Sequence, residues 1–538
     1  MSEKYVIKNG FIVDGSGDKG FFADIEISGD RINRISKTGL SSDNIIDVSG
    51  MVVAPGFIDI HSHSDYHILL NPYAESKIRQ GVTTEVNGNC GYSIAPVDGI
   101  IKEEREHQYY DSYRLELNIK SLSDYISLVE KNGTSINIAM LVGHGTIRGS
   151  VMGRRANRAT DEELNRMRKL VKESMEAGAF GMSTGLAYTP GAYADTQEII
   201  ELAKVVADYN GIYATHMRSE GRKLVEAVEE ALEIGKYGGL PIEISHLKTM
   251  HPENWYKIDR VFELIESAQR NNIDVAADRY PYLSAYTGLA SVMPDWVFAD
   301  STEAALKRLE DKNIRKKIEM ELADQHKDLY GYLSRIVLSQ CFTQEYKRFE
   351  GKNIVEIASE LHIPPMEVIY NILIKEQLMT TAIYFVMNED NLKRILLKPY
   401  VSIGSDAGLR ANYGPLYEGK PHPRAYGTYP RVFTDFVNTG ILSLEQAVHK
   451  MTLLPARRAG IKQRGMIREG WFADLVVFSK EQIKDMATYI NPHVYPSGIN
   501  TVIVNGKIVI RDGEHTKVLA GRMLKKNGVA GRDGARIE

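Results

Sequence analysis

The sequence predicts an α/β protein. We expect a TIM-like (β/α)8 barrel, a small β-sandwich domain built from both termini, and an inserted subdomain after strand seven. Three observations lead to this prediction. Short apolar runs alternate with helical segments through the middle of the chain, β-branched segments of similar pattern stand near both ends, and the alternation is interrupted once. The expected limits are 1–57 and 456–520 for the β-domain, 58–455 for the barrel, about 285–345 for the insertion and 521–538 for a glycine-rich tail.

Eight apolar runs are the candidate barrel strands. They are 57–63, 83–88, 136–143, 180–184, 212–216, 241–246, 273–278 and 400–406. A connecting helix is clearest after residue 160, where Thr160 and Glu163 form a capping box ahead of an apolar stripe through Met167 and Val171. Gly178 is expected to end this helix. Strands that alternate with helices in this way are typical of parallel β/α units.

The two ends of the chain carry similar segments. Asn9-Gly10 and Asn505-Gly506 each stand between β-branched runs, and Asn-Gly tolerates the positive φ angles of a tight hairpin turn. A further strand-like run, 23–35, follows the first pair, and 473–478 precedes the second. We therefore expect two hairpins that belong to one β-domain.

The alternation is interrupted between the seventh and eighth strands, which lie about 120 residues apart. A connection of that length must carry its own structure. Its first part, 300–330, is charged, and Leu306, Leu309 and Ile318 are spaced for one helix face. Because the segment leaves from the end of a barrel strand, we expect it to cover the barrel mouth as a lid.

Composition narrows the class of protein. The 538 residues are 43% hydrophobic and 25% charged, as in globular proteins, and a net charge of −4 gives no reason to expect nucleic acid or an anionic membrane as a partner. Two cysteines cannot form a disulfide framework. The first residues, MSEKYVIKNG, lack the pattern of a secretory signal, and no apolar run reaches the length of a membrane span. We expect a cytoplasmic protein. The sequence does not indicate its oligomeric state.

Polar residues gather at the carboxyl ends of the predicted strands. The residues are His61 and His63 after the first, Cys90 after the second, His216 at the fifth, His246 at the sixth and Asp406 at the eighth. In a β/α barrel this end is the catalytic face. A lone strand histidine is usually a packed residue, but so many on one face favour a metal site, and a few nitrogen or sulfur donors with an open position are what catalytic zinc requires.

The segment GFIDIHSHSD resembles the His-x-His signature of the amidohydrolase superfamily. Some branches of that superfamily carry a metal-bridging lysine on strand four, but 181–191 reads GMSTGLAYTPG, and Cys90 is the alternative bridging donor. In these features the chain resembles the D-aminoacylase (N-acyl-D-amino-acid deacylase) family. The matching motifs are GNCG (88–91), LVGHGTIR (141–148), GMSTGL (181–186), YATHMRSE (213–220), ISHLK (244–248), DRYPY (278–282), GSDAG (404–408) and HPRAYGT (422–428).

The resemblance implies metal-dependent hydrolysis of N-acyl-D-amino acids. It implies a tight zinc site formed by Cys90, His216 and His246, and a second, weaker site at His61 and His63. Asp406 would be both a metal ligand and the catalytic acid/base, and Lys248, Tyr282 and Arg424 would hold the substrate carboxylate. Independently of family, an aspartate can take a proton from water and return it to a leaving amine, and a planar guanidinium suits a carboxylate.

One departure and two alternatives remain. The loop 407–421 is longer than expected and adds a second cation, Arg410. A hydrolase of cyclic amides or imides would use the same barrel, although the missing strand-four lysine and Cys90 count against it. A metal-binding barrel without catalysis is the other alternative, and Asp406 counts against it. His251 and Cys341 have no partner in the sequence pattern.

Overall fold

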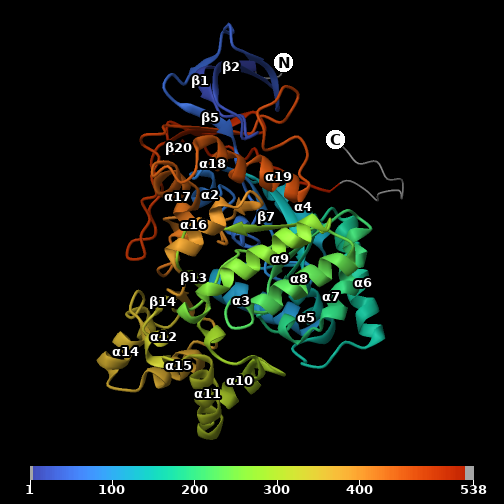
Figure 1. The fold of residues 1–538 in the computed structure, drawn as a ribbon, viewed down its shortest axis with the longest axis vertical. Coiled ribbons are helices and arrows are strands. Elements are labelled where there is room, and N and C mark those ends of the chain that lie inside the picture. The colour runs from blue at the N-terminus through green and yellow to red at the C-terminus, as the bar shows by residue number, and fades with distance from the viewer. Residues whose placement is uncertain (1–3, 527–538) are drawn as a thin grey trace.

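The computed structural model describes residues 4–526, so most of the predicted tail 521–538 lies outside the described residues (Figure 1). Eight parallel strands form its central sheet, each paired with the next along the chain. They are β6 (Phe57–Asp59), β7 (Val82–Asn87), β8 (Asn137–Gly143), β9 (Gly181–Gly185), β10 (Ile212–His216), β11 (Ile242–Ile244), β12 (Val275–Arg279) and β16 (Val401–Ile403). Beyond β6 and β16, Ser62 pairs with Ala407, and the Asp406 amide donates to the His61 carbonyl at 2.7 Å. These contacts join the first and last strands, which confirms the barrel.

Helices connect and surround these strands. They are α1 (His67–Leu70), α2 (Glu75–Ile78), α3 (Gly99–Tyr113), α4 (Leu122–Asn132), α5 (His144–Met152), α6 (Asp161–Glu176), α7 (Thr196–Ala207), α8 (Leu224–Gly238), α9 (Ile258–Arg270), α16 (Glu389–Leu397), α17 (Arg424–Val432), α18 (Leu444–Met451) and α19 (Leu453–Ala459). The capping box at Thr160 and Glu163 is present at the start of α6. Met167 and Val171 are buried there in the main apolar core, so α6 has the amphipathic pattern that its sequence predicts.

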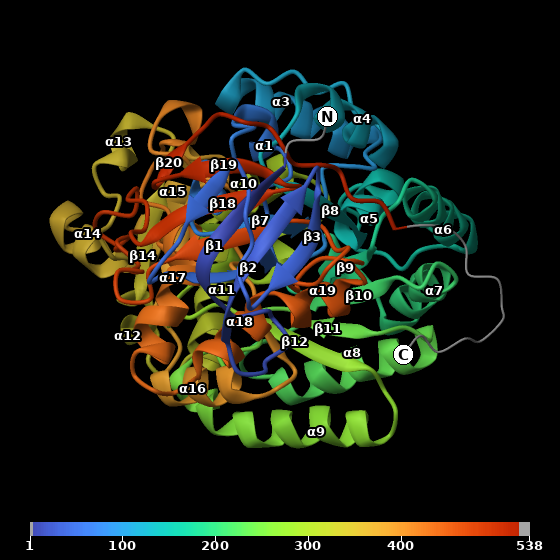
Figure 2. The same ribbon diagram turned by 90° about the horizontal axis from the view of Figure 1, so that it is seen from above.

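Both ends of the described chain meet in one nine-stranded sheet. Its strands are β1 (Lys4–Ile12), β2 (Phe21–Ser28), β3 (Arg31–Ser36), β4 (Ile45–Asp47), β5 (Val52–Pro55), β17 (Leu475–Phe478), β18 (Ile499–Val504), β19 (Lys507–Arg511) and β20 (Glu514–His515). The two sets join where β5 pairs with β17, so that β17 and β5 lie between β18 and β1, and Figure 2 shows the strands of both sets at the same end of the molecule. The predicted β-domain built from both termini is thus part of the confirmed fold class.

One of the two predicted hairpins is wrong. Asn505-Gly506 does turn the chain between β18 and β19, with φ angles of 48° and 74°. Asn9-Gly10 instead forms a bulge within the single strand β1, which pairs with β2 on both sides of it. Asn9 has a φ of 63°, and its amide donates to Asp24 Oδ1 at 2.8 Å. Asn9 and Asn505 both adopt a positive φ, which suits a bulge as well as a hairpin turn. Which of the two forms depends on the strand that pairs with each segment.

The insertion between β12 and β16 has its own sheet and core. Strands β13 (Ala285–Gly288) and β14 (Ile336–Gln340) both pair with β15 (Thr381–Tyr384). Its helices are α10 (Thr302–Glu310), α11 (Lys312–Gln325), α12 (Leu329–Leu333), α13 (Gln344–Lys347), α14 (Ile354–Leu361) and α15 (Pro365–Lys375). A separate apolar core runs from Leu289 to Val386. The expected range 285–345 is therefore too short, because the middle strand of the sheet comes from residues 381–384.

The terminal sheet and the insertion lie at opposite ends of the barrel (Figure 1). Asn137, at the start of β8, hydrogen-bonds both Asp474 and Asn505 of the terminal sheet, at 3.3 and 2.8 Å. The sheet therefore contacts the amino ends of the barrel strands, and their carboxyl ends face the insertion. Among the helices of residues 4–526, none is long and apolar enough to cross a membrane.

Candidate active site

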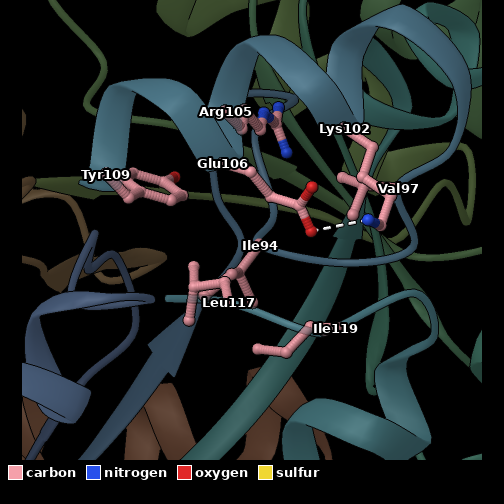
Figure 3. A pocket seen from close by; sticks show the side chains of 8 residues that line it. All are labelled: Ile94, Val97, Lys102, Arg105, Glu106, Tyr109, Leu117 and Ile119. Carbon is pink, nitrogen blue, oxygen red and sulfur yellow. Dashed lines mark hydrogen bonds and ion pairs between the residues drawn. The ribbon is translucent and has the colours of Figure 1, made fainter. Parts of the chain in front are cut away.

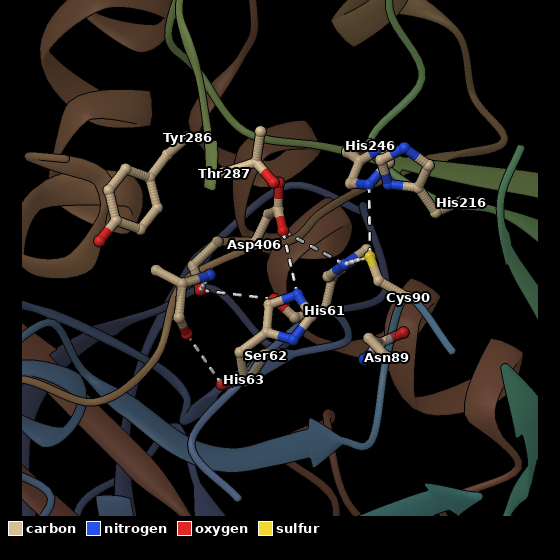
Figure 4. A network of polar contacts seen from close by, with 12 residues as sticks. His61, Ser62, His63, Asn89, Cys90, His216, His246, Tyr286, Thr287 and Asp406 are labelled. Carbon is tan, nitrogen blue, oxygen red and sulfur yellow. Dashed lines mark hydrogen bonds and ion pairs between the residues drawn. The ribbon is translucent and has the colours of Figure 1, made fainter. Parts of the chain in front are cut away.

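Side chains at the carboxyl ends of β6, β7, β10, β11 and β16 converge (Figure 4). Ligand atoms of His61, Cys90, His246 and Asp406 all lie within 4.8 Å of one another. His61 and His63 follow β6 rather than lie within it. The pairing of Ser62 with Ala407 joins this segment to the one after β16. The rings of His61 and His63 lie 5.3 Å apart at the same site.

The distances in this cluster are short. Cys90 Sγ lies 3.2 Å from His61 Nε2 and 3.4 Å from His246 Nε2. Asp406 Oδ1 lies 3.1 Å from His63 Nε2 and 3.4 Å from His61 Nε2. Cys90, His246 and Asp406 also share positive φ angles of 52°, 38° and 51°. Such backbone is costly for residues other than glycine and concentrates at functional sites.

The donor set fits a borderline-soft divalent metal such as zinc. Burial raises the pKa of the Cys90 thiol, but the neighbouring imidazoles of His61, His246 and His216 outweigh it and bring the pKa well below its usual range. A thiolate with several imidazoles is a typical zinc set. His216 packs edge-on against His246 with ring centroids 4.5 Å apart. Its buried Nδ1 has no hydrogen-bond partner among the described residues, as expected of a nitrogen free to bind an ion.

Two carboxylates that the sequence interpretation missed orient the imidazoles. Asp278 lies 3.1 Å from His61 Nδ1 and accepts the backbone amide of His246 at 2.9 Å. Glu220 lies 2.9 Å from His246 Nδ1 and forms an ion pair with Lys248. Carboxylates behind metal-binding histidines fix the ring orientation. Both residues lie in the motifs YATHMRSE and DRYPY, so an acidic residue next to a strand end was the available signal.

The three predicted substrate-binding residues differ in position. Arg424 Nη1 lies 3.0 Å from Asp406 Oδ2, so this guanidinium reaches the cluster. Lys248 is buried. Its ammonium forms an ion pair with Glu220 and lies 2.8 Å from His246 Nδ1. The hydroxyl of Tyr282 donates to Asp485 Oδ2 at 2.8 Å, away from the donors.

Tyr280 occupies the position beside Arg424 instead. Its ring centroid lies 4.5 Å from the Arg424 guanidinium carbon. Its buried hydroxyl has no hydrogen-bond partner within residues 4–526. Burial raises the pKa of this phenol, but the charges of Lys248, Arg279 and Arg424 outweigh it and lower the pKa. The motif DRYPY contains both tyrosines, and sequence alone cannot tell which one faces the site.

The insertion and the long loop also border the site. Tyr286 and Thr287 of β13 lie beside Asp406 in Figure 4, and the Tyr286 carbonyl accepts from Arg424 Nη2 at 3.5 Å. Arg410, on the loop 407–421, is buried, and its Nη1 has no hydrogen-bond partner in the described part of the chain. The first strand of the insertion therefore helps to form the wall of the site.

A separate small pocket lies beside α3 (Figure 3). It is lined by Ile94, Val97, Lys102, Arg105, Glu106, Tyr109, Leu117 and Ile119. Lys102 and Glu106 form an ion pair across one turn of α3. None of the candidate metal donors lines this pocket, so it is not part of the site.

Comparison with known proteins gives consistent matches. The sequence model of the Amidohydrolase family matches residues 44–510. The chain is 36% identical to a D-aminoacylase of Alcaligenes xylosoxydans xylosoxydans over 97% of both chains. An N-acyl-D-glutamate deacylase from Bordetella bronchiseptica, solved with zinc and a phosphonate mimic of the tetrahedral intermediate, aligns with a TM-score of 0.81 and 31% identity over 98% of this chain and 100% of that one. A D-aminoacylase with a binuclear metal centre, described as having one-metal activation and second-metal attenuation, aligns with a TM-score of 0.79 and 33% identity over 97% and 99%.

Proposed function

The chain belongs to the amidohydrolase family, and we propose that it hydrolyses the amide bond of N-acyl-D-amino acids to a carboxylic acid and a free D-amino acid. The observation that carries this proposal is the convergence of Cys90, His246 and Asp406 with Arg424 beside them. Zinc donors, a proton carrier and a carboxylate-binding cation are the groups that the reaction needs. The D-aminoacylase and N-acyl-D-glutamate deacylase relatives support the substrate class.

We assign a tight zinc site to Cys90, His216 and His246, and a second, weaker site to His61 and His63, with Asp406 as a ligand. Zinc held by these residues would acidify water and polarise a carbonyl oxygen. Asp278 and Glu220 support the assignment because each lies behind one of the imidazoles. The reaction then needs no covalent nucleophile from the protein.

Asp406 is the proposed acid/base. Burial raises its pKa, but Arg424, His246 and His61 outweigh it and hold the pKa well below its usual range. The carboxylate is therefore ionised in the resting enzyme. It accepts a proton from the attacking water at Oδ1 or Oδ2 and delivers it to the leaving nitrogen, so that a neutral amine departs.

Arg424 is the proposed binder of the α-carboxylate. Its guanidinium is already desolvated, and a second anion beside it would form a charge-assisted pair. Lys248 contributes positive charge from behind His246. We assign the remaining polar contact to Tyr280 rather than Tyr282, because the Tyr280 hydroxyl is free and the Tyr282 hydroxyl is bound to Asp485.

The alternatives are less well supported. Strand β9, Gly181–Gly185, reads GMSTG and offers no lysine to bridge metals for cyclic amides. A barrel without catalysis would have no use for a buried Asp406 between two imidazoles and a guanidinium. We further propose a cytoplasmic location, since a thiolate ligand such as Cys90 stays reduced there.

Paired kinetics on N-acetyl-D-methionine and N-acetyl-L-methionine, with released amine as the readout, test the proposal. We expect kcat/KM to favour the D substrate by roughly a hundredfold or more, since the wrong hand would leave a buried charge unpaired. Arg424→Ala should abolish most activity, and Arg457→Ala, at an exposed arginine on α19, should not. A preference for the L substrate, or full activity in Arg424→Ala, would contradict it.

A further inference from the structure

A second group of potential metal ligands lies away from the active site. His251 and Glu253 come from the segment between β11 and α9, where Glu253 lies in the 3-10 helix η2 (Pro252–Lys257). His326 caps the end of α11 in the insertion. One ligand atom from each of these three residues lies within 4.8 Å of the others. The group shares no residue with the active-site cluster and joins the barrel to the insertion.

The two imidazoles are close together and uncommitted. Their ring centroids lie 5.0 Å apart, and the ring of Tyr332 stacks on His326 at 3.9 Å. Both rings are only partly buried, and neither contributes to the buried side-chain nitrogens that lack a partner in the described part of the chain. Their ring nitrogens therefore reach solvent, where an ion from solution can approach them.

His251 is also held in costly backbone. Its φ is 69° and its ψ is 138°, a combination that residues other than glycine rarely adopt. Hydrogen bonds fix it there, because its amide donates to the Val386 carbonyl at 2.8 Å and its carbonyl accepts from Asn254 at 2.9 Å. This conformation keeps the imidazole next to His326 rather than in solvent.

Both rings have the protonation state that metals bind. Burial, then the charges of His326 and Arg335, lower the pKa of His251 to about 3. Burial also lowers the pKa of His326, which the Glu253 carboxylate opposes. Neutral imidazoles therefore face the exposed Glu253 side chain, and a cation entering this group displaces no proton from either ring at neutral pH.

We propose that His251, Glu253 and His326 bind a divalent ion of the zinc type that fastens the insertion to the barrel. Two imidazoles and one carboxylate, with positions left for water, are a common zinc ligand set. His251 and Glu253 lie in the same segment after β11 as His246 and Lys248. The ion would therefore hold the loop that carries these active-site residues, and the ion itself would take no part in the reaction. Next to it, the Val386 carbonyl already receives the Trp255 indole at 3.2 Å, and the ion adds a tie to α11.

The first test counts metal. Full-length holoenzyme is dialysed to equilibrium against zinc chloride, and zinc per chain is measured by elemental analysis. We expect the wild type to hold one equivalent more than His326→Ala. The matched control is His107→Ala, at an exposed histidine of α3 outside the group, which should hold as much as the wild type. Equal zinc in the wild type and in His326→Ala would overturn the proposal.

The second test measures stability and does not depend on deacylase activity. Added zinc should raise the midpoint of thermal unfolding of the wild type and His107→Ala more than that of His326→Ala, because an ion that binds only the folded protein stabilises it. Glu253→Gln serves if His326→Ala fails to fold, since Glu253 is exposed. An identical zinc response in Glu253→Gln and wild type would also count against the site.

Discussion

The candidate metal site contains the thiolate of Cys90, whereas other amidohydrolase sites contain a lysine on strand four. It follows β7 in a left-handed conformation, and Gly91 behind it approaches the Gly185 amide so closely that an added Cβ would lie 2.5 Å away. The tight approach leaves the thiolate facing His61 and His246.

Cys90→Ala should remove most of the tightly held metal. The thiolate is the soft donor of the set, and its loss leaves histidines that hold zinc less strongly. Elemental analysis of the purified variant measures the loss, and Cys341→Ala is the control because Cys341 is buried in the insertion. Full metal content and full activity in Cys90→Ala would show that Cys90 is not a metal ligand.

Asp406→Asn should preserve the fold and slow turnover by about 10²–10⁴-fold, because the amide has the shape of the carboxylate but cannot accept a proton from the attacking water at neutral pH. Steady-state kcat measures the effect, and circular dichroism checks the fold. A kcat within a few-fold of the wild type would exclude Asp406 as the acid/base.

At the scale of elements, the segments that follow β10 and β11 act together. Glu220, four residues beyond His216, contacts His246 and Lys248, and its carbonyl accepts the Met250 amide at 2.7 Å. Burial raises the pKa of Glu220, but Lys248, His216 and His246 outweigh it and lower the pKa well below its usual range. One ionised carboxylate thereby positions an imidazole from the neighbouring strand.

Glu220→Gln should weaken zinc binding by about 10–100-fold, because the imidazole of His246 loses the carboxylate that orients it. Competition with a zinc chelator measures the affinity. Glu229→Gln, at an exposed glutamate of α8, is the control. Unchanged zinc affinity in Glu220→Gln would mean that Glu220 pairs with Lys248 without affecting the metal.

At the scale of the molecule, a buried lysine helps to close the barrel. Lys77 of α2 forms ion pairs with Asp59 at 2.8 Å and Glu85 at 2.9 Å. It also donates to Ser405 Oγ and to the Ala407 carbonyl at 2.9 and 2.8 Å. One ammonium thus joins β6 and β7 to the segment beyond β16, where the first and last strands meet.

Lys77→Met should lower the free energy of unfolding by about 3–5 kcal/mol, because it leaves two buried carboxylates without their cation. Urea denaturation at neutral pH measures this loss, and Lys172→Met, at an exposed lysine of α6, should be nearly neutral. Burial lowers the pKa of Lys77, but Asp59 and Glu85 outweigh it and raise the pKa above 10.5. On the alkaline side the stabilisation therefore persists up to about pH 10.5 and is lost as the pH rises through the higher pKa that Lys77 has in the folded protein. A loss under 1 kcal/mol would mean that Lys77 is not needed to hold the first and last barrel strands together.

The sequence by itself determined the barrel, its family and the residues that gather at its carboxyl end. Strand periodicity and β/α alternation are local properties, and residues at the ends of parallel strands must meet wherever such strands close. His61, Cys90, His216, His246 and Asp406 could therefore be named from their strand positions alone.

Only the tertiary structure decided the remaining features. Asn9-Gly10 is a bulge because β2 lies beside both halves of β1, and the insertion extends to Val386 because β15 pairs with β13. Tyr280 faces Arg424 while Tyr282 faces Asp485, and His251 meets His326 across 75 positions of sequence. Each outcome depends on pairing between distant segments, and local pattern carries no record of which segments will meet.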